Sequence, residues 1–160
     1  MRHRIRQFRD AGKRPSEADF ELAHEHLGAT LFELFRGQHP RDIVHSAGAA
    51  RWLLERGHTN PDLIAAALLH DVGKGHQRRM DRVAYVLASY VRVTKFVGSA
   101  ESRFVLRSAV FRSDCHGQRG AEMLGRADAP EVVVTLTRLH HMPLRADPVL
   151  ALLQQADAAN

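Results

Sequence analysis

Residues 67–74 read Ala-Leu-Leu-His-Asp-Val-Gly-Lys. They close an apolar segment, Leu63–Val72, whose length and composition predict a helix that stops at Gly73. The start of this helix is also marked, because Asn60 can act as its N-cap and Pro61 suits the first helical position. His70 and Asp71 are therefore expected in the last turn of an apolar helix, where both side chains can reach one cavity.

Helical signals of this kind extend along nearly the whole chain and predict an all-α protein. Ser16 and Asp19 resemble a capping box, and apolar residues then recur at helical spacing from Phe20 until Gly37. The valine triplet 132–134 could form a strand, but its flanks and length favour a helix. The other helices are expected at 41–54, 82–97, 101–112, a short segment capped by Ser113 or Asp114 that carries His116, a segment between Pro130 and Pro143, and 149–157.

Composition predicts one globular domain. The chain has 160 residues, of which 44% are apolar and 26% are charged. No apolar run approaches the roughly 18 residues of a membrane span, and no apolar stretch follows the basic N-terminus as in a secretory signal. The single cysteine, Cys115, excludes an internal disulfide and favours a reducing, cytoplasmic location.

The positive charge is concentrated in two regions. Residues 1–14 carry a net charge of +5, and we expect residues 1–15 to form a basic, disordered tail before a single domain at 16–160. Residues 74–112 contain nine basic and two acidic side chains, a net charge of +7 directly after the His-Asp pair. This excess is suited to holding an anionic substrate, although solvated helix faces would give the same pattern.

An ordered set of seven histidines and aspartates points to metal binding. Imidazole and carboxylate are common ligands of Mn, Fe and Zn, and a carboxylate can bridge two such ions. Five imidazoles and two carboxylates are more than one divalent cation can use, so the set favours a pair of cations. Its members are His45, His70, Asp71, His116, His140, His141 and Asp157.

Spacing predicts one of the required encounters. His45 lies 13 residues before His58 and His70 lies 12 residues after it. Two antiparallel helices that rise about 1.5 Å per residue would therefore carry both rings to one level, on the order of 18 Å from the turn. The same reasoning fails for Asp157, which cannot come level with the His140-His141 pair on a simple hairpin. Either the helices cross at an angle or Asp157 serves the other metal.

The stretch 67–74, preceded by His45 and followed by Asp157, resembles the HD-domain superfamily of metal-dependent phosphohydrolases. Residues 116–124, His-Gly-Gln-Arg-Gly-Ala-Glu-Met-Leu, and the His140-His141 pair resemble its HDIG and HD-GYP branch, which includes cyclic-dinucleotide phosphodiesterases. The resemblance covers about residues 40–158, and no Gly-Tyr-Pro sequence occurs in the chain. It implies a compact bundle of roughly seven helices.

The resemblance also implies a role for each matching residue. Asp71 would bridge two divalent cations, with Mn or Fe expected before Mg, Zn, Ni or Co. One cation would be held by His45, His70, Asp71 and Asp157, and the other by Asp71, His116, His140 and His141. Lys74 matches a position that contacts substrate phosphate, so Asp71 and Lys74 are the expected catalytic residues. Further substrate contacts are expected from Arg78, Arg79 and Arg119.

The expected reaction is hydrolysis of a phosphoester in a nucleotide-type substrate, with cyclic dinucleotides and dinucleoside polyphosphates as candidates. The expected partner is thus a phosphorylated small molecule rather than nucleic acid or a membrane. A homodimer is the expected assembly if a second chain supplies the helix that would follow Asp157. Two alternatives stay open: a mixed-valent di-iron oxygenase, and a non-catalytic regulatory module that binds a nucleotide or a partner.

Overall fold

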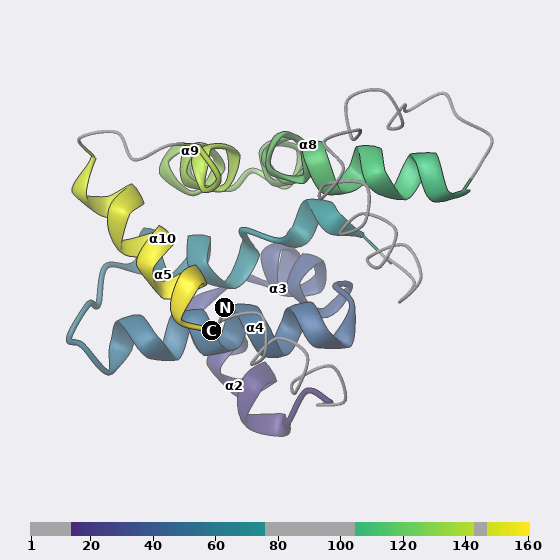
Figure 1. Cartoon of the computed structure of the whole chain (residues 1–160). Coiled ribbons are helices and arrows are strands. Elements are labelled where there is room, and N and C mark those ends of the chain that lie inside the picture. Colours follow the sequence, from purple (N-terminus) through teal and green to yellow (C-terminus); the bar gives the residue numbers. More distant parts are fainter. Residues whose placement is uncertain (1–13, 76–104, 143–146) are drawn as a thin grey trace.

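The computed structural model describes residues 14–75, 105–142 and 147–160. The predicted helix at 82–97, most of the predicted tail, and Arg78 and Arg79 lie outside these residues. Within them the fold is helical throughout, with seven α-helices, a short 3-10 helix and no strand (Figure 1). The all-α bundle predicted from the sequence is confirmed.

The helices have the following bounds, with labels as in Figure 1: α2 (Glu17–His26), α3 (Ala29–Arg36), α4 (Pro40–Leu54), α5 (Pro61–Leu69), the 3-10 helix η2 (Val72–Lys74), α8 (Val105–Arg126), α9 (Glu131–Leu139) and α10 (Pro148–Ala159).

Three predicted helix starts have the side-chain caps that the sequence suggested. Ser16 and Asp19 form the capping box of α2. The Asn60 side chain accepts hydrogen bonds from the backbone N–H groups of residues 62 and 63, and Asp147 accepts the corresponding pair at the start of α10. Each cap satisfies N–H groups that the first helical turn leaves without partners.

The helix predicted for Leu63–Val72 ends at Leu69, so His70 and Asp71 follow it, and two other predicted boundaries were also wrong. The repeat from Phe20 to Gly37 is broken, because Leu27 adopts extended dihedrals (φ −120°, ψ 137°) and Gly28 becomes the N-cap of a new helix. The break lets α2 and α3 pack against each other while both contact α5. In contrast, α8 continues through Ser113 and Asp114, so the separate short helix does not exist and His116 lies within a helix of 22 residues.

The central element is α5. Every residue from Leu63 to Leu69 is buried, as expected for a helix that is apolar on all sides. It packs against α4, α9 and α10, and its C-terminal end leads directly into η2, which packs against α8. The residues that follow α5 are consequently delivered to the interior of the bundle rather than to its surface.

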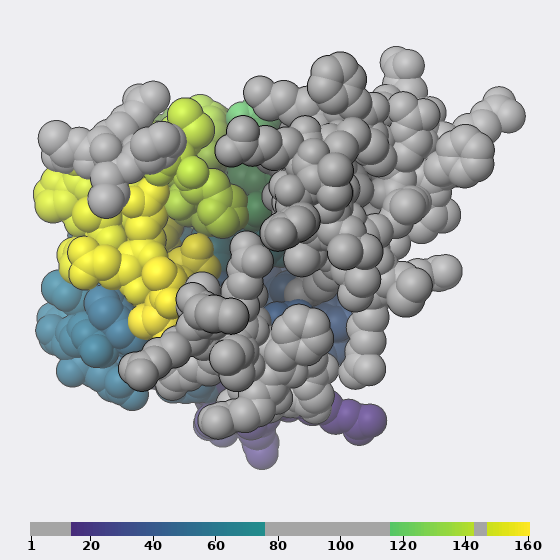
Figure 2. Space-filling model, viewed as in Figure 1, coloured from purple at the N-terminus to yellow at the C-terminus, as the bar shows by residue number. Residues whose placement is uncertain are grey.

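The C-terminal helix completes this arrangement. In Figures 1 and 2, α10 (yellow) lies between α9 and the α4–α5 pair, and it contacts all three. Leu150, Leu153 and Ala156 are its buried residues, and they place the last turn of α10 beside α4. None of the described helices is long and apolar enough to cross a membrane.

Candidate metal centre

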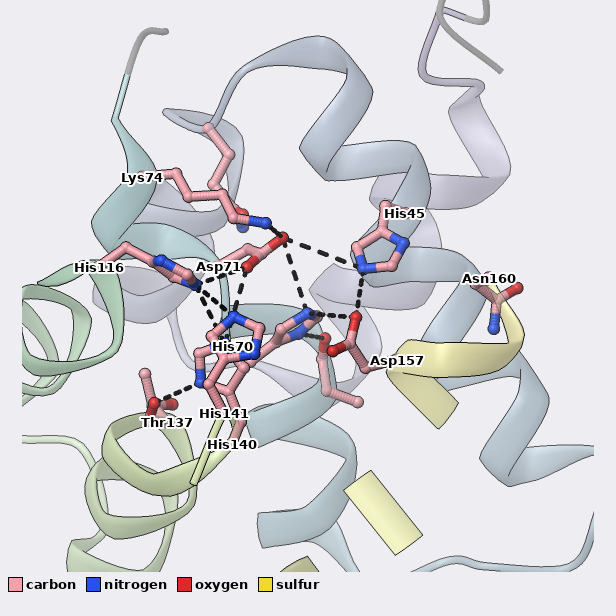
Figure 3. Close-up of polar contacts among 12 residues, drawn as sticks. His45, His70, Asp71, Lys74, His116, Thr137, His140, His141, Asp157 and Asn160 are labelled. Carbon is pink, nitrogen blue, oxygen red and sulfur yellow. Dashed lines mark hydrogen bonds and ion pairs between the residues drawn. The ribbon is translucent and has the colours of Figure 1, made fainter. Parts of the chain in front are cut away.

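Five segments of the bundle bring the seven predicted ligands to one place (Figure 3). The segments are α4, the α5–η2 junction, α8, the end of α9, and α10. His70 is the C-cap of α5, Asp71 the N-cap of η2 and His140 the C-cap of α9. Three of the ligands thus sit where a helix ends, which allows neighbouring side chains to point into a common space.

The first group of ligands consists of His45, His70 and Asp157. The Nε2 atom of His45 lies 2.8 Å from Oδ1 of Asp157, and Nε2 of His70 lies 3.6 Å from the same oxygen. The rings of the two histidines are 5.3 Å apart, which confirms the meeting predicted from their distances to the turn. Asp157 joins this group, which answers the question that spacing left open.

The second group consists of His116, His140 and His141. Nε2 of His116 lies 3.2 Å from Nε2 of His140 and 2.9 Å from Nε2 of His141. Two adjacent residues can both reach His116 because α9 ends at Leu139. Three imidazole nitrogens from two helices therefore converge on one point.

Asp71 stands between the two groups and turns one carboxylate oxygen to each (Figure 3). Its Oδ2 atom lies 3.7 Å from Nε2 of His70 and 4.0 Å from Nε2 of His45. Its Oδ1 atom lies 3.5 Å from Nε2 of His116 and 3.9 Å from Nε2 of His140. Asp71 is thus the residue that faces both groups.

The ring orientations of two ligands are set by the ends of their own helices. Nδ1 of His70 donates to the carbonyl of Ala67 at 2.9 Å, and Nδ1 of His140 donates to the carbonyl of Thr137 at 2.6 Å. In both cases the carbonyl lies three residues earlier and is available because the helix stops. Each bond turns Nε2 toward the centre, and in the neutral ring it leaves the Nε2 lone pair available to a metal. Sequence reasoning missed these partners because they are backbone atoms.

The donors of each group could hold a divalent cation. Two ligands bonded to one metal at ~2.0–2.2 Å, at right or tetrahedral angles, lie about 2.8–3.6 Å apart. The distances within the two groups, 2.8, 3.6, 3.2 and 2.9 Å, fall in that range, and of the four distances to Asp71 only the 3.5 Å contact with His116 does. In addition, Nε2 of His70 and Oδ1 of Asp71 are fully buried without a hydrogen-bond partner, a costly state that metal coordination would relieve.

The centre has a buried floor and a partly open side. The side chains of His70 and Asp71 are 0% and 1% exposed, whereas those of His45 and Asp157 are 17% and 25% exposed. His141 is also exposed. A small ligand could thus reach the centre from the side that carries the exposed members.

The metal-free groups differ in their protonation. Burial acts to lower the pKa of His70, but the carboxylates of Asp71 and Asp157 outweigh it and raise this pKa to about 9. Burial and the neighbouring His70 lower the pKa of His140 to about 2. Burial opposes ionisation of the two aspartates, yet Lys74 and the histidines hold the pKa of Asp71 below its usual range, and His45 and His70 do the same for Asp157. Near neutral pH, His70 is therefore protonated and His140 is a free base.

Close backbone contact positions His116. A Cβ atom on Gly73 would lie 2.0 Å from the carbonyl oxygen of His116 and 2.5 Å from the backbone nitrogen of Gly120. Only a residue without a side chain allows η2 and α8 to approach this closely. The sequence predicted that the helix stops at Gly73, but α5 ends at Leu69 and Gly73 lies within η2, where it fixes the distance between Asp71 and His116.

Lys74 is the one predicted substrate contact that the structure brings to the centre. Its ammonium group binds Oδ2 of Asp71, and its side chain is 25% exposed. Arg119 lies on α8 and is half-buried, and within the described ranges it forms no hydrogen bond or ion pair with the seven ligands. Arg78 and Arg79 lie outside the described residues.

Comparison with known proteins supports the same assignment. The family model of the HD domain matches residues 36–159, which include all seven ligands and Lys74. No curated protein and no solved structure gives a significant match. The chain therefore belongs to the HD domain family, a superfamily of metal-dependent phosphohydrolases.

Proposed function

We propose that this protein is a phosphohydrolase with a binuclear metal centre. The observation that carries the proposal is the position of Asp71, whose two oxygens face two separate groups of ligands. A mononuclear site would leave one group without a role. Here each group has three donors of its own and one oxygen of the shared carboxylate.

His45, His70 and Asp157 would hold one divalent cation together with Oδ2 of Asp71. The second would be held by His116, His140 and His141 together with Oδ1. When bound, such a pair lowers the pKa of water, neutralises phosphoryl oxygens and stabilises the leaving group. Mn and Fe suit these mixed imidazole and carboxylate donors.

The residues of the chain would contribute positioning and charge. The buried carbonyls of Ala67 and Thr137 keep the rings of His70 and His140 aimed at the centre. Lys74 would bind a non-bridging phosphate oxygen through its ammonium group. In the reaction, the oxygen of a water molecule attacks phosphorus, the bond to the ester oxygen breaks, and that oxygen leaves with a proton.

A nucleotide-type substrate is supported by charge. Residues 74–112 carry a net charge of +7, and this segment begins at Lys74 beside the centre. Arg78, Arg79 and Arg119 are proposed as additional phosphate contacts. Cyclic dinucleotides and dinucleoside polyphosphates are the candidate substrates. We also propose that the chain belongs to the HDIG/HD-GYP-like branch, because residues 116–124 and the His140-His141 pair resemble it. Its single cysteine supports assignment to the cytoplasm.

The test is hydrolysis of a phosphodiester under nitrogen by protein loaded with Mn²⁺. Bis(p-nitrophenyl) phosphate serves as a general substrate, followed by cyclic dinucleotides and dinucleoside polyphosphates. We expect metal-dependent hydrolysis that Asp71→Asn abolishes, because an amide cannot bridge two cations. Asp128→Asn is the matched control, since Asp128 is exposed in the turn after α8.

Other outcomes would favour the alternatives. Turnover with iron that strictly requires O₂ would support the oxygenase. Tight binding of metal and nucleotide without turnover of any tested ester would support the regulatory module. Hydrolysis that continues unchanged in Asp71→Asn would contradict the proposed centre.

A further inference from the structure

Lys74 makes the two halves of the centre unequal. Its ammonium group binds Oδ2 of Asp71, the oxygen that faces His45 and His70. The other oxygen, Oδ1, faces His116 and His140 and has no hydrogen-bond partner. Within the described residues, the Asp71 oxygen that faces the first group is therefore paired with a lysine of the chain itself. Among the same residues, the oxygen that faces the second group has no such lysine.

This contact has an electrostatic cause. The Asp71 side chain is 1% exposed, and a buried carboxylate requires a cationic partner. Lys74 is held close by its position in η2, three residues after Asp71. A cation bound between His45, His70, Asp157 and Oδ2 would repel the ammonium group at this short range. This repulsion weakens the contact between Lys74 and Oδ2 when the cation is bound.

The lysine side chain is able to leave. It is 25% exposed, and its flexible stem can place the ammonium group in several positions without moving the backbone. The ammonium group of Lys74 would then lie at the open side of the centre without its carboxylate partner. An ammonium group in that state is suited to bind an anionic oxygen.

We propose that Lys74 is a displaceable counter-ion, which cation binding at His45, His70 and Asp157 releases from Asp71 to bind phosphate. This inference rests on the proposed function and adds regulation to it. Occupation of the first group creates the phosphate site, so metal and phosphate favour each other's binding, as linkage requires.

Calorimetric titration of the metal-free protein with Mn²⁺ tests the displacement. Lys74→Met removes the charge and keeps the length, and it should tighten one of the two sites by about tenfold, equivalent to about 1.4 kcal/mol. Lys74→Arg keeps the charge and should resemble the wild type. Lys74→Gln, a second neutral variant, should repeat the effect of Lys74→Met.

Two backgrounds identify the affected site. In His141→Gln, where the second group is disrupted, Lys74→Met should still tighten Mn²⁺ binding. In Asp157→Asn, where the first group is disrupted, the gain should disappear. Titration of the Mn²⁺-saturated protein with inorganic phosphate should show weaker binding in Lys74→Met than in the wild type.

The results separate this inference from the proposed function. If the wild type binds two Mn²⁺ ions and Lys74→Met binds them with unchanged affinity, the displacement is wrong and the binuclear centre stands. A gain that persists in Asp157→Asn would also overturn it. If the wild type binds fewer than two Mn²⁺ ions, the binuclear centre fails and this inference fails with it.

Discussion

Gly73→Ala is the substitution for which the structure gives the clearest consequence. The added Cβ would lie 2.0 Å from the His116 carbonyl oxygen and 2.5 Å from the Gly120 nitrogen. Cβ atoms in proteins essentially always keep at least 3.0 Å from heavy atoms to which they are not bonded. The backbone of η2 or α8 must therefore shift by about 1 Å or more, because neither contact is with a flexible side chain.

The expected cost follows from the size of that shift. Overpacking of a core costs about 1–3 kcal/mol, which corresponds to a fall in melting temperature of roughly 2–12 °C for a domain of this length. The same shift would separate His116 from Asp71, whose atoms are now 3.5 Å apart, and would alter its 2.9 and 3.2 Å distances to His141 and His140. The second cation should be lost while the first group of ligands is kept.

Thermal unfolding and metal analysis of the same samples measure both effects. Gly125→Ala is the matched control, because Gly125 lies in α8, the helix that Gly73 packs against, and an added Cβ there meets nothing within 4 Å. That control should stabilise α8 by about 0.5–1 kcal/mol, as alanine does in helices, and should keep two metals. A Gly73→Ala protein with wild-type stability and two metals per chain would show that the close contact of Gly73 with α8 does not position His116.

The remaining predictions concern the ligands. Asp71→Asn should abolish hydrolysis and lower the metal content, because both groups share this carboxylate; a variant that keeps two metals and full activity would contradict its bridging role. Asp157→Asn and His141→Gln should each remove one cation, as measured by elemental analysis, whereas the control His24→Gln, at an exposed position, should remove none. Because the pKa of His70 is raised to about 9, its proton must leave when metal binds, and the affinity of the first site should rise about tenfold per pH unit between about pH 6 and pH 8. The stability that protonated His70 gives the metal-free chain depends on pH in the opposite sense: it is complete below the ordinary pKa of 6.5 and is lost as the pH rises through about 9. Titration calorimetry measures the first dependence, and unfolding at several pH values measures the second. A metal affinity that does not change with pH would contradict the assignment of His70 as a ligand.

The meeting of His45 and His70 could be predicted from sequence because it depends on a single turn between two consecutive helices. His45 and His70 lie at nearly equal distances from one turn, and the constant rise of a helix then fixes their level. The caps at Asn60 and Asp147 were equally predictable, since a cap depends only on its own helix.

Features that depend on tertiary packing could not be derived in this way. Spacing does not encode a crossing angle, so the partner of Asp157 stayed open until α10 was seen beside α4. The break at Leu27 was missed because the apolar repeat continues across it. The continuity of α8 through Ser113 was missed because the surrounding helix overrides the local preference of this residue for a cap position. The steric role of Gly73 depends on α8, which lies more than 30 residues later in the chain.

The most direct test of the binuclear centre is the metal content of freshly purified protein, measured by elemental analysis without chelators. We predict about two Mn or Fe per chain. The metal content should fall to about one per chain in Asp157→Asn and in His141→Gln. A stoichiometry of one in the wild type would contradict the bridging role of Asp71. No bound metal, even after reconstitution, would contradict the metal centre itself.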